Sequence, residues 1–333
     1  MKRWLKLAVF AFAGLIALAA CGTNAKDGEE KTASQNGETY KVGATQIVEH
    51  PSLDEAFTGF QEALKDAGLD VEYDFQSAQG DQNNVSTIAQ NFVADDVDLI
   101  FANSTPSALG ALQATSEIPI VFTSVTDAVE ANLIKSMDEG EENITGVVDL
   151  HPDSIRMTID FIDTYFEGST VGLLYNAGEQ NSVVQIKAVE DAVEGTSLST
   201  TERTVANSSE VQQAATTLVG EADVLFIVTD NTVVSALESV VGVARDQRIP
   251  LIVGEPDSLA KGGFATYGID YHSIGYRSGE MAADILTGEK TTKDIPAEYP
   301  KETQLFINKQ AAEEQAIEWN NEWDDLAEFV ESE

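Results

Sequence analysis

The sequence predicts an α/β protein made of two similar lobes, each a doubly wound parallel sheet with helices on both faces. Two observations lead to this fold class. Short apolar runs of β-forming residues alternate with amphipathic helical stretches. The same alternation then recurs in the same order, at an offset of roughly 125 to 131 residues.

The repeat is clearest in segments that read as strand, turn and helix. VDLIFANSTPSALGAL, from Val97, matches ADVLFIVTDNTVVSALESV, from Ala222, while IPIVFTSV, from Ile118, matches IPLIVGEP, from Ile249. In parallel sheets the polar turns gather at the carboxyl ends of the strands, where ligands bind. Two lobes whose strand ends face one another would form a cleft that closes on a small molecule.

Helices are predicted where apolar residues recur at three- and four-residue spacing, because this spacing gives a helix one apolar face. Each such face can cover one side of a parallel sheet. The clearest helical stretches are Leu53–Ala67, Asn84–Ala94, Ser182–Val193, Ser209–Val219 and Ile274–Leu286.

Another matching pair, GVVDLH and GIDYH, comes earlier than the common offset requires. This shift indicates that the chain crosses between the lobes near Asp149 and again near Asp270. We therefore assign 39–148 together with 272–300 to the first lobe, and 150–269 to the second.

The C-terminal segment 301–333 is predicted to add a strand and an acidic amphipathic helix. An interaction helix for another protein is the alternative. The predicted apolar stripe consists of Ala316, Trp319, Trp323, Leu326, Ala327 and Val330.

The first 20 residues are typical of a secretory signal peptide: a basic start is followed by an apolar run too short to span a bilayer. The run ends in Leu-Ala-Ala-Cys, which resembles the lipobox of bacterial lipoproteins. That resemblance implies lipidation of Cys21, the only cysteine of the chain. A chance cysteine after an ordinary signal is the alternative. The polar stretch 21–38 is expected to be a flexible tether that holds the protein outside the cytoplasm.

The net charge of −38, from 57 acidic and 19 basic residues, excludes nucleic acid as a partner. The acidity suits a saline or alkaline exterior, although acidic surfaces also aid solubility in general. Charge therefore says little about the ligand.

In the first lobe, hydroxyl and amide side chains follow the predicted strands and begin the next helices. Together with free N–H groups at helix N-termini they would suit a ligand carboxylate; helix capping alone is the alternative. The candidate ligand-binding residues of this lobe are Gln46, Glu49, Ser104, Thr105, Thr123, Ser124 and Thr126.

The second lobe carries acids and amides at the corresponding positions, namely Asn176, Glu179, Asn181, Asp230 and Asp257. Acids would receive an ammonium group, so the two lobes together match a zwitterion, an amino acid. In a chain this acidic, solvated surface acids are the alternative. Which acid would hold the amine stays open.

No catalytic constellation is recognisable, since the chain lacks a GxSxG elbow, a P-loop and a GxGxxG turn after a strand. The three histidines, His50, His151 and His272, form no HxxxH pair, so we expect neither a metal site nor a cofactor.

Several motifs, in order from about Tyr40 to Lys309, resemble the TrpX-type substrate-binding lipoproteins of ABC importers: TQIVEHPSLD, SAQGDQNN, IPIVFTSVTD, YNAGEQNSVVQ, TDNTVVSALESV and ATYGIDY. The resemblance implies the type I periplasmic-binding-protein fold and an aromatic amino acid as ligand, tryptophan first, with tyrosine or phenylalanine as alternatives. It also implies a permease and its ATPase as partners, a membrane contact through the lipid alone, and a monomeric receptor without enzymatic activity.

Other readings of the same architecture stay open. A sugar or nucleoside receptor is one, although the candidate strand ends lack arginine. A sensor that presents its ligand to a membrane kinase is another. A hydrolase that uses paired acids is a third.

Overall fold

The structure, a computed structural model, describes residues 39–332. The predicted signal peptide, Cys21 and the whole predicted tether, 21–38, therefore lie outside the described residues. Two β-sheets organise the described part of the chain. We call each sheet with its covering helices a lobe.

The first sheet is wholly parallel, with strand order β2-β1-β3-β4-β5. Its central strands are buried on both faces, which explains their continuous apolar sequences. The strands are β1 (Thr39–Gln46), β2 (Asp70–Ser77), β3 (Leu99–Asn103), β4 (Ile120–Val125) and β5 (Ile144–Val148).

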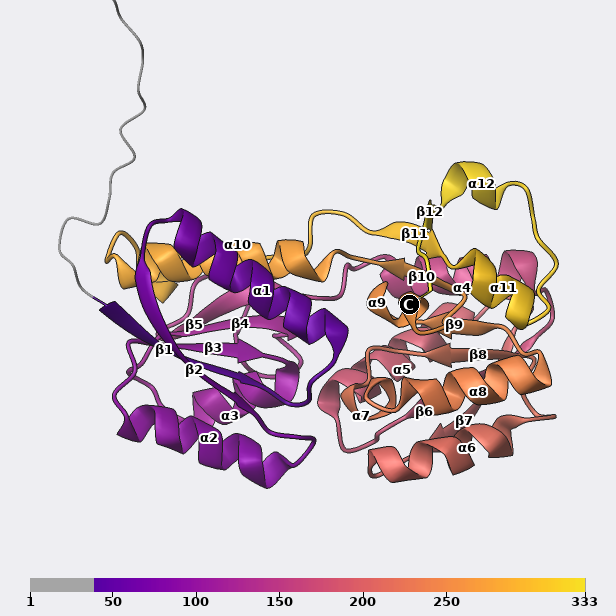
Figure 1. Ribbon diagram of the computed structural model, residues 1–333, viewed down its shortest axis with the longest axis horizontal. Helices are drawn as coiled ribbons and strands as arrows, with labels where there is room; N and C mark the ends of the chain where they lie inside the picture. The colour runs from indigo at the N-terminus through magenta and orange to yellow at the C-terminus, as the bar shows by residue number, and fades with distance from the viewer. Residues whose placement is uncertain (1–38, 333) are drawn as a thin grey trace, which may run out of the picture. The chain divides into compact units, whose positions relative to one another are not determined.

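Four helices cover this sheet. The core on one face includes residues of α2 (Gln82–Ala94) and α3 (Thr105–Ala114). The other face is covered by α1 (Pro51–Asp66) and α10 (Tyr271–Leu286), which lie side by side although far apart in sequence (Figure 1). The lobe is therefore closed by a helix from the far end of the chain.

Helix α1 shows how the local sequence sets an element near the site. Pro51 occupies the first turn, where a missing N–H costs nothing. Ala56, Phe60, Ala63 and Leu64 form its buried face. A side chain at Gly275 of α10 would collide with the backbone of Ala56, so this glycine allows the two helices to pack closely.

The second sheet has strand order β12-β11-β10-β9-β8-β6-β7. Its strands from β6 to β10 are parallel, whereas β11 pairs antiparallel with β10. The strands are β6 (Thr170–Tyr175), β7 (Ser199–Thr204), β8 (Val224–Ile227), β9 (Leu251–Val253), β10 (Ala265–Gly268), β11 (Gln304–Ile307) and β12 (Glu328–Phe329).

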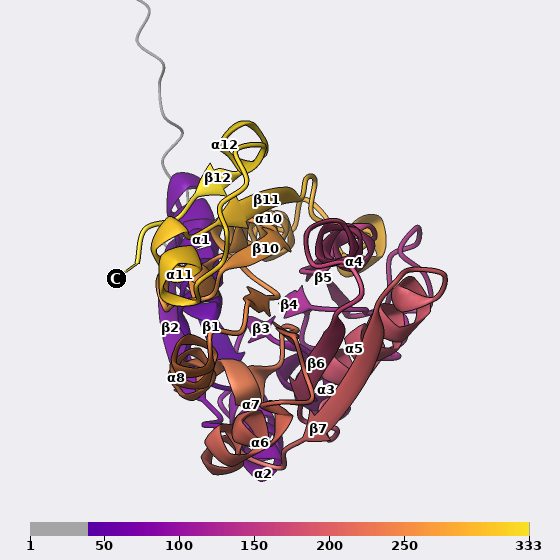
Figure 2. The same ribbon diagram turned by 90° about the vertical axis from the view of Figure 1, so that its right-hand side faces the viewer.

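Helices lie on both faces of this sheet as well. In Figure 2, α4 and α5 lie on one side of β6, and α6 and α8 on the other. The helices are α4 (Ser154–Tyr165), α5 (Gln180–Val193), α6 (Val211–Leu218), α7 (Asn231–Val234), α8 (Leu237–Gln247), α9 (Asp257–Ala260), α11 (Lys309–Glu314) and α12 (Trp323–Leu326). Two single 3₁₀ turns are η1 (Ser208–Glu210) and η2 (Thr292–Asp294).

The predicted α/β class with two parallel-sheet lobes is confirmed, and all five predicted helices are present to within a few residues. The chain leaves the first sheet after Val148, returns through Asp270 into α10, and reaches β11 through 299–303. Three crossover segments thus join the two lobes.

The predicted amphipathic helix at the C-terminus is wrong. Ala316 has a left-handed φ of 57° and follows the end of α11, and only one further turn, α12, forms before β12. The stripe does not share a buried face: Trp323 is buried among Phe161 and Phe264, whereas Leu326 is exposed. Burial of one large indole determines the path of this segment.

Candidate functional site

A small enclosed cavity, here the central cavity, lies where the carboxyl ends of strands from both sheets meet. Its volume is about 10 Å³, roughly the space of one water molecule. Both lobes and two crossover segments contribute to its wall. The lining residues are His50, Leu53, Ser124, Thr126, Asp149, Asn181, Thr229, Asp230, Asn231, Val234, Glu255 and Tyr271.

The first lobe presents a neutral network next to this cavity. The buried amide of Asn103 donates to Gln46 Oε1 at 3.1 Å and to the Leu53 carbonyl at 2.7 Å, and it accepts from Ser124 Oγ at 2.7 Å. Gln46 in turn donates to Asp54. The predicted residue Gln46 therefore positions Ser124 through Asn103 and does not itself line the cavity.

Two serines of this lobe have unusual backbones. Ser124, at the end of β4, has a φ of 55°, and Ser104, the N-cap of α3, has a φ of 144°. Such conformations are costly for residues other than glycine and concentrate at functional sites. The Ser104 side chain caps the N–H of Ser107, so its predicted ligand role competes with a capping role.

The remaining predicted residues of the first lobe differ in environment. Thr126 lines the cavity and accepts a hydrogen bond from Gln185 of α5 at 3.3 Å. Thr105 and Thr123 are buried and their hydroxyls have no partner among the described residues, but neither lines the cavity. Glu49 is exposed and also lies outside the lining.

In the second lobe, the predicted Glu179 is buried, and both of its carboxylate oxygens accept hydrogen bonds from residues of its own lobe. Oε1 accepts from the N–H and hydroxyl of Thr232, and Oε2 accepts from the N–H and side chain of Asn231. These bonds satisfy free donors at the start of α7. Glu179 is thus a capping residue in this structure.

Asp230 is completely buried and also tied to its own lobe, although it lines the cavity. Its Oδ2 accepts from the Asn176 N–H and from Ser182 Oγ, both at 2.6 Å, and its Oδ1 accepts from the Val233 N–H at 2.7 Å. Burial, followed by repulsion from Glu179, raises the pKa of Asp230.

Glu255 lines the cavity, whereas the predicted Asp257 does not. Glu255 accepts from Ser52 Oγ at 2.7 Å and from the N–H and hydroxyl of Ser258. Burial raises the pKa of both carboxyl groups, and their mutual repulsion raises that of Glu255 further. Asp257 is only half-buried.

Asp149 and Tyr271 belong to the crossover segments and were not among the predicted site residues. The Tyr271 hydroxyl donates to Asp149 Oδ2 at 2.9 Å. Burial raises the pKa of Asp149 to about 6. A signal for this residue was present in the sequence, because the early repeat pair placed a chain crossing at this aspartate.

His50, at the N-cap of α1, also lines the cavity. Burial, and then the charge of Lys261, lower its pKa to about 3, so the ring is neutral at pH 7. Among residues 39–332, no three histidine, cysteine, aspartate or glutamate side chains are grouped to hold a metal ion.

Three buried polar atoms of the cavity lining have no hydrogen-bond partner within the described part of the chain: His50 Nδ1, Asp149 Oδ1 and Asn181 Oδ1. Leaving such atoms unpaired costs about 1–3 kcal/mol each. The wall also holds three buried carboxyl groups, Asp149, Asp230 and Glu255, and no lysine or arginine. This arrangement favours a ligand that brings a cationic hydrogen-bond donor.

Direct hydrogen bonds join the lobes around the cavity. Ser52 of α1 donates to Glu255 of the second lobe at 2.7 Å, and Gln185 of α5 donates to Thr126 of the first. Gln180 reaches the Glu130 carbonyl. The cavity is small because these contacts hold its walls together.

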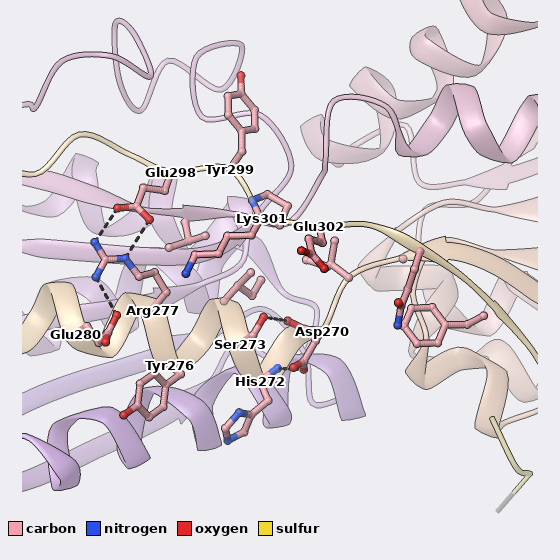
Figure 3. Close-up of a pocket in the computed structure, with 17 residues that line it drawn as sticks. Asp270, His272, Ser273, Tyr276, Arg277, Glu280, Glu298, Tyr299, Lys301 and Glu302 are labelled. Atoms are coloured by element: carbon pink, nitrogen blue, oxygen red, sulfur yellow. Dashed lines mark hydrogen bonds and ion pairs between the residues drawn. The ribbon is translucent and has the colours of Figure 1, made fainter. Parts of the chain in front are cut away.

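A larger cavity, about 600 Å³, lies along the crossover segments, and none of the predicted site residues line it. Figure 3 shows Arg277 in this cavity, held between Glu298 and Glu280. These ion pairs raise the pKa of Arg277 and use its donors. Because Arg277 is already paired, and because none of the candidate residues at the strand ends reach this larger cavity, we place the functional site at the smaller cavity.

Comparison with known proteins agrees with this geometry. A family model described as ABC transporter substrate binding protein matches residues 41–330. The chain belongs to this family. Substrate-binding proteins of ABC transporters act outside the cytoplasm. Within residues 39–332, no helix combines the length and apolar character needed to cross a membrane.

Three relatives are informative. A tyrosine-binding protein of Clostridioides difficile is 40% identical, over 92% of this chain and 90% of its own length. A structure from Streptococcus pneumonia in complex with L-Trp is 29% identical with a TM-score of 0.83, over 88% of this chain and all of the other. The ligand-free, open structure of an adhesive substrate-binding protein of Clostridium difficile is 36% identical, over 88% of this chain and all of the other, with a TM-score of 0.65.

The order of these two solved structures by TM-score is the reverse of their order by sequence identity. The L-Trp complex is less identical to this chain, yet it superposes better than the ligand-free, open structure. Together with the hydrogen bonds between the lobes, this indicates that the present structure has a closed arrangement.

Of the predicted ligand-binding residues, the structure brings four together at the central cavity: Ser124, Thr126, Asn181 and Asp230. Asn176 and Glu179 line a separate groove, while Gln46, Glu49, Ser104, Thr105, Thr123 and Asp257 line neither. Position at a strand end therefore did not distinguish residues that cap helices from residues that face the central cavity.

Proposed function

We propose that this protein is the receptor of an ABC importer and captures an aromatic amino acid between its lobes. The observation that carries the proposal is the lining of the central cavity: three buried carboxyl groups, unpaired hydrogen-bond acceptors and no basic side chain. An α-ammonium group would compensate this charge, and the neutral hydroxyls of the first lobe suit the α-carboxylate. The protein binds its ligand and carries out no reaction on it.

The relatives support an aromatic side chain. The relative of higher identity is named a tyrosine-binding protein, and the structure that superposes well contains L-Trp. We therefore keep tryptophan as first candidate, with tyrosine beside it and phenylalanine third. The hydroxyl of tyrosine and the indole N–H of tryptophan differ in position, so a site that pairs with one of them should bind the two amino acids with clearly different affinities.

Binding requires that the lobes first part. A cavity of about 10 Å³ cannot hold an aromatic side chain, so the ligand enters an open form and the lobes close on it. Contacts made to both lobes at once would then favour the closed form.

The site of action follows from the same proposal. A signal peptide, a lipid on Cys21 and a polar tether would hold a monomeric receptor at the outer face of the membrane, where it meets the permease and its ATPase. Cys21→Ala tests the anchor: the variant is expected in the medium and the wild-type protein in the membrane fraction. Retention of both in the membrane would contradict lipid anchoring.

The ligand is tested by isothermal titration of the purified protein with tryptophan, tyrosine, phenylalanine and a panel of sugars and nucleosides. We expect saturable binding of at least one aromatic amino acid and a raised melting temperature in its presence. Binding of a sugar or nucleoside, with no response to amino acids, would overturn the proposal.

A further inference from the structure

The three acids of the central cavity can be separated by counting which of their oxygens already accept hydrogen bonds. Asp230 uses both oxygens for three donors of its own lobe. Glu255 uses Oε2 for Ser52 and the Ser258 N–H, and Oε1 for the Ser258 hydroxyl. Only Asp149 has an oxygen, Oδ1, that is buried and without a partner among residues 39–332.

The surroundings of Asp149 prepare this oxygen for a ligand. Tyr271 donates to the other oxygen at 2.9 Å and fixes the orientation of the carboxyl group. Asn181 offers a second free acceptor, Oδ1, to the same cavity, while its Nδ2 is occupied by the Thr229 carbonyl at 3.0 Å. Two free acceptors, one of them a carboxylate, meet in a space without a cation.

We propose that Asp149 Oδ1, together with Asn181 Oδ1, receives the α-ammonium group of the ligand. An ammonium group has three donors and no acceptor, which matches two open acceptors and one anionic charge. This inference rests on the proposed amino-acid receptor function and adds the residue that recognises the amine. It replaces the expectation that an acid at a strand end of the second lobe does so.

The electrostatics agree with this assignment. Burial raises the pKa of Asp149 to about 6, because no positive charge compensates the carboxylate in the ligand-free protein. A bound ammonium group would lower it again. The titratable groups that line the cavity together with Asp149 are Tyr271, Glu255, Asp230 and the neutral His50. The hydroxyl of Thr126 also lies near the Asp149 carboxyl group, but it is uncharged, so the ligand would supply the missing positive charge.

The test compares L-tyrosine with 3-(4-hydroxyphenyl)propanoate, which lacks only the amine; if tryptophan binds better, indole-3-propanoate replaces the latter. The wild-type protein should prefer the amino acid by about a hundredfold or more, since loss of a buried charged partner is costly. In Asp149→Asn the preference should fall to within about fivefold. Asn can still accept from Tyr271, so the variant removes charge with little change in shape.

A matched control is Glu298→Gln, which neutralises an acid bonded to Arg277 near the same crossover but outside the central cavity. It should keep the wild-type preference. An unchanged preference in Asp149→Asn would overturn the inference, as would an equal loss in Glu298→Gln.

A second measurement does not depend on the variant folding. In a crystal structure of the wild-type protein with L-tyrosine, or with tryptophan if that binds better, the amine nitrogen should lie within hydrogen-bond distance of Asp149 Oδ1. An amine placed on Asp230, Glu255 or Asp257 would overturn the inference while leaving the receptor function intact. A wild-type protein that binds no amino acid would instead overturn the proposed function itself.

Discussion

The two lobes contribute differently to the wall of the central cavity. At the strand ends of the first lobe, Gln46, Asn103 and Ser124 form an uncharged network. At those of the second, Glu179 and Asp230 are carboxyl groups, and both accept hydrogen bonds from backbone and side-chain donors of their own lobe. An acid at a strand end can therefore have a purely structural role. Only a carboxylate oxygen that accepts no hydrogen bond within the protein is available to a ligand.

The largest expected effect tests the structural role of the second lobe's acid. Asp230→Ala leaves three buried donors without an acceptor, so the free energy of unfolding should fall by about 3–5 kcal/mol. Urea denaturation followed by circular dichroism measures this. Asp257→Ala, at a half-buried position, should stay within about 1 kcal/mol of the wild type. An equal loss of stability in the two variants would contradict the structural role assigned to Asp230.

The next effect concerns pH and the crossover acid. The pKa of Asp149 is about 6 in the folded protein and 3.8 in the unfolded chain, so the folded state binds more protons between these values. The contribution to stability is complete below pH 3.8 and is lost as pH rises through about 6. The loss amounts to about 3 kcal/mol at most.

This pH effect is measured as the melting temperature of the ligand-free protein at pH 5 and at pH 7.5. The decrease should be smaller in Asp149→Asn than in the wild type, by about 2–5 °C. The other acidic residues of the chain are the same in the variant and in the wild type, so their contribution to the pH dependence cancels in this comparison. Identical pH profiles would show that the Asp149 carboxyl group does not carry the effect.

A smaller loss is expected when the neutral network of the first lobe is cut. Asn103→Ala removes two donated bonds and one accepted bond, and should lower the free energy of unfolding by about 2 kcal/mol. Asn83→Ala, on the exposed start of α2, should change it by less than about 0.5 kcal/mol. A loss of 4 kcal/mol or more in Asn103→Ala would mean that this network contributes as much to stability as Asp230 does.

The smallest effect concerns the contact between the lobes. Ser52→Ala removes the bond to Glu255, while Glu255 keeps its bonds to Ser258. Because the closed ligand-free form excludes ligand, its weakening should tighten apparent affinity by about two- to fivefold. Titration calorimetry measures this against Thr58→Ala, an exposed change on the same helix. Weaker binding in Ser52→Ala would mean that the serine contacts ligand.

Much of the fold was predictable because its determinants are local or repeated. The apolar spacing of α1 and α10 and the repeated strand–turn–helix segments each depend on neighbouring residues. The C-terminal segment was not predictable, because Trp323 packs against Phe161 and Phe264, far away in sequence.

The residues that line the candidate site could be predicted only in part, for the same reason. Ser124, Asn181 and Asp230 follow strands and could be found by position. Whether an oxygen remains free depends on distant donors: Tyr271 binds one oxygen of Asp149 across 122 residues and leaves the other open. No local pattern distinguishes that aspartate from one that is fully bonded.

The order of elements along the chain has a consequence for biosynthesis. Helix α10, which packs beside α1 on the first sheet, follows β10, and β11, which pairs with β10, follows α10. As the polypeptide emerges, the first sheet lacks one of its four covering helices until α10 has been made. Domains usually mature from the N-terminus during synthesis. Here the last elements of both lobes come from residues after 270, so neither lobe can be completed until most of the chain is present.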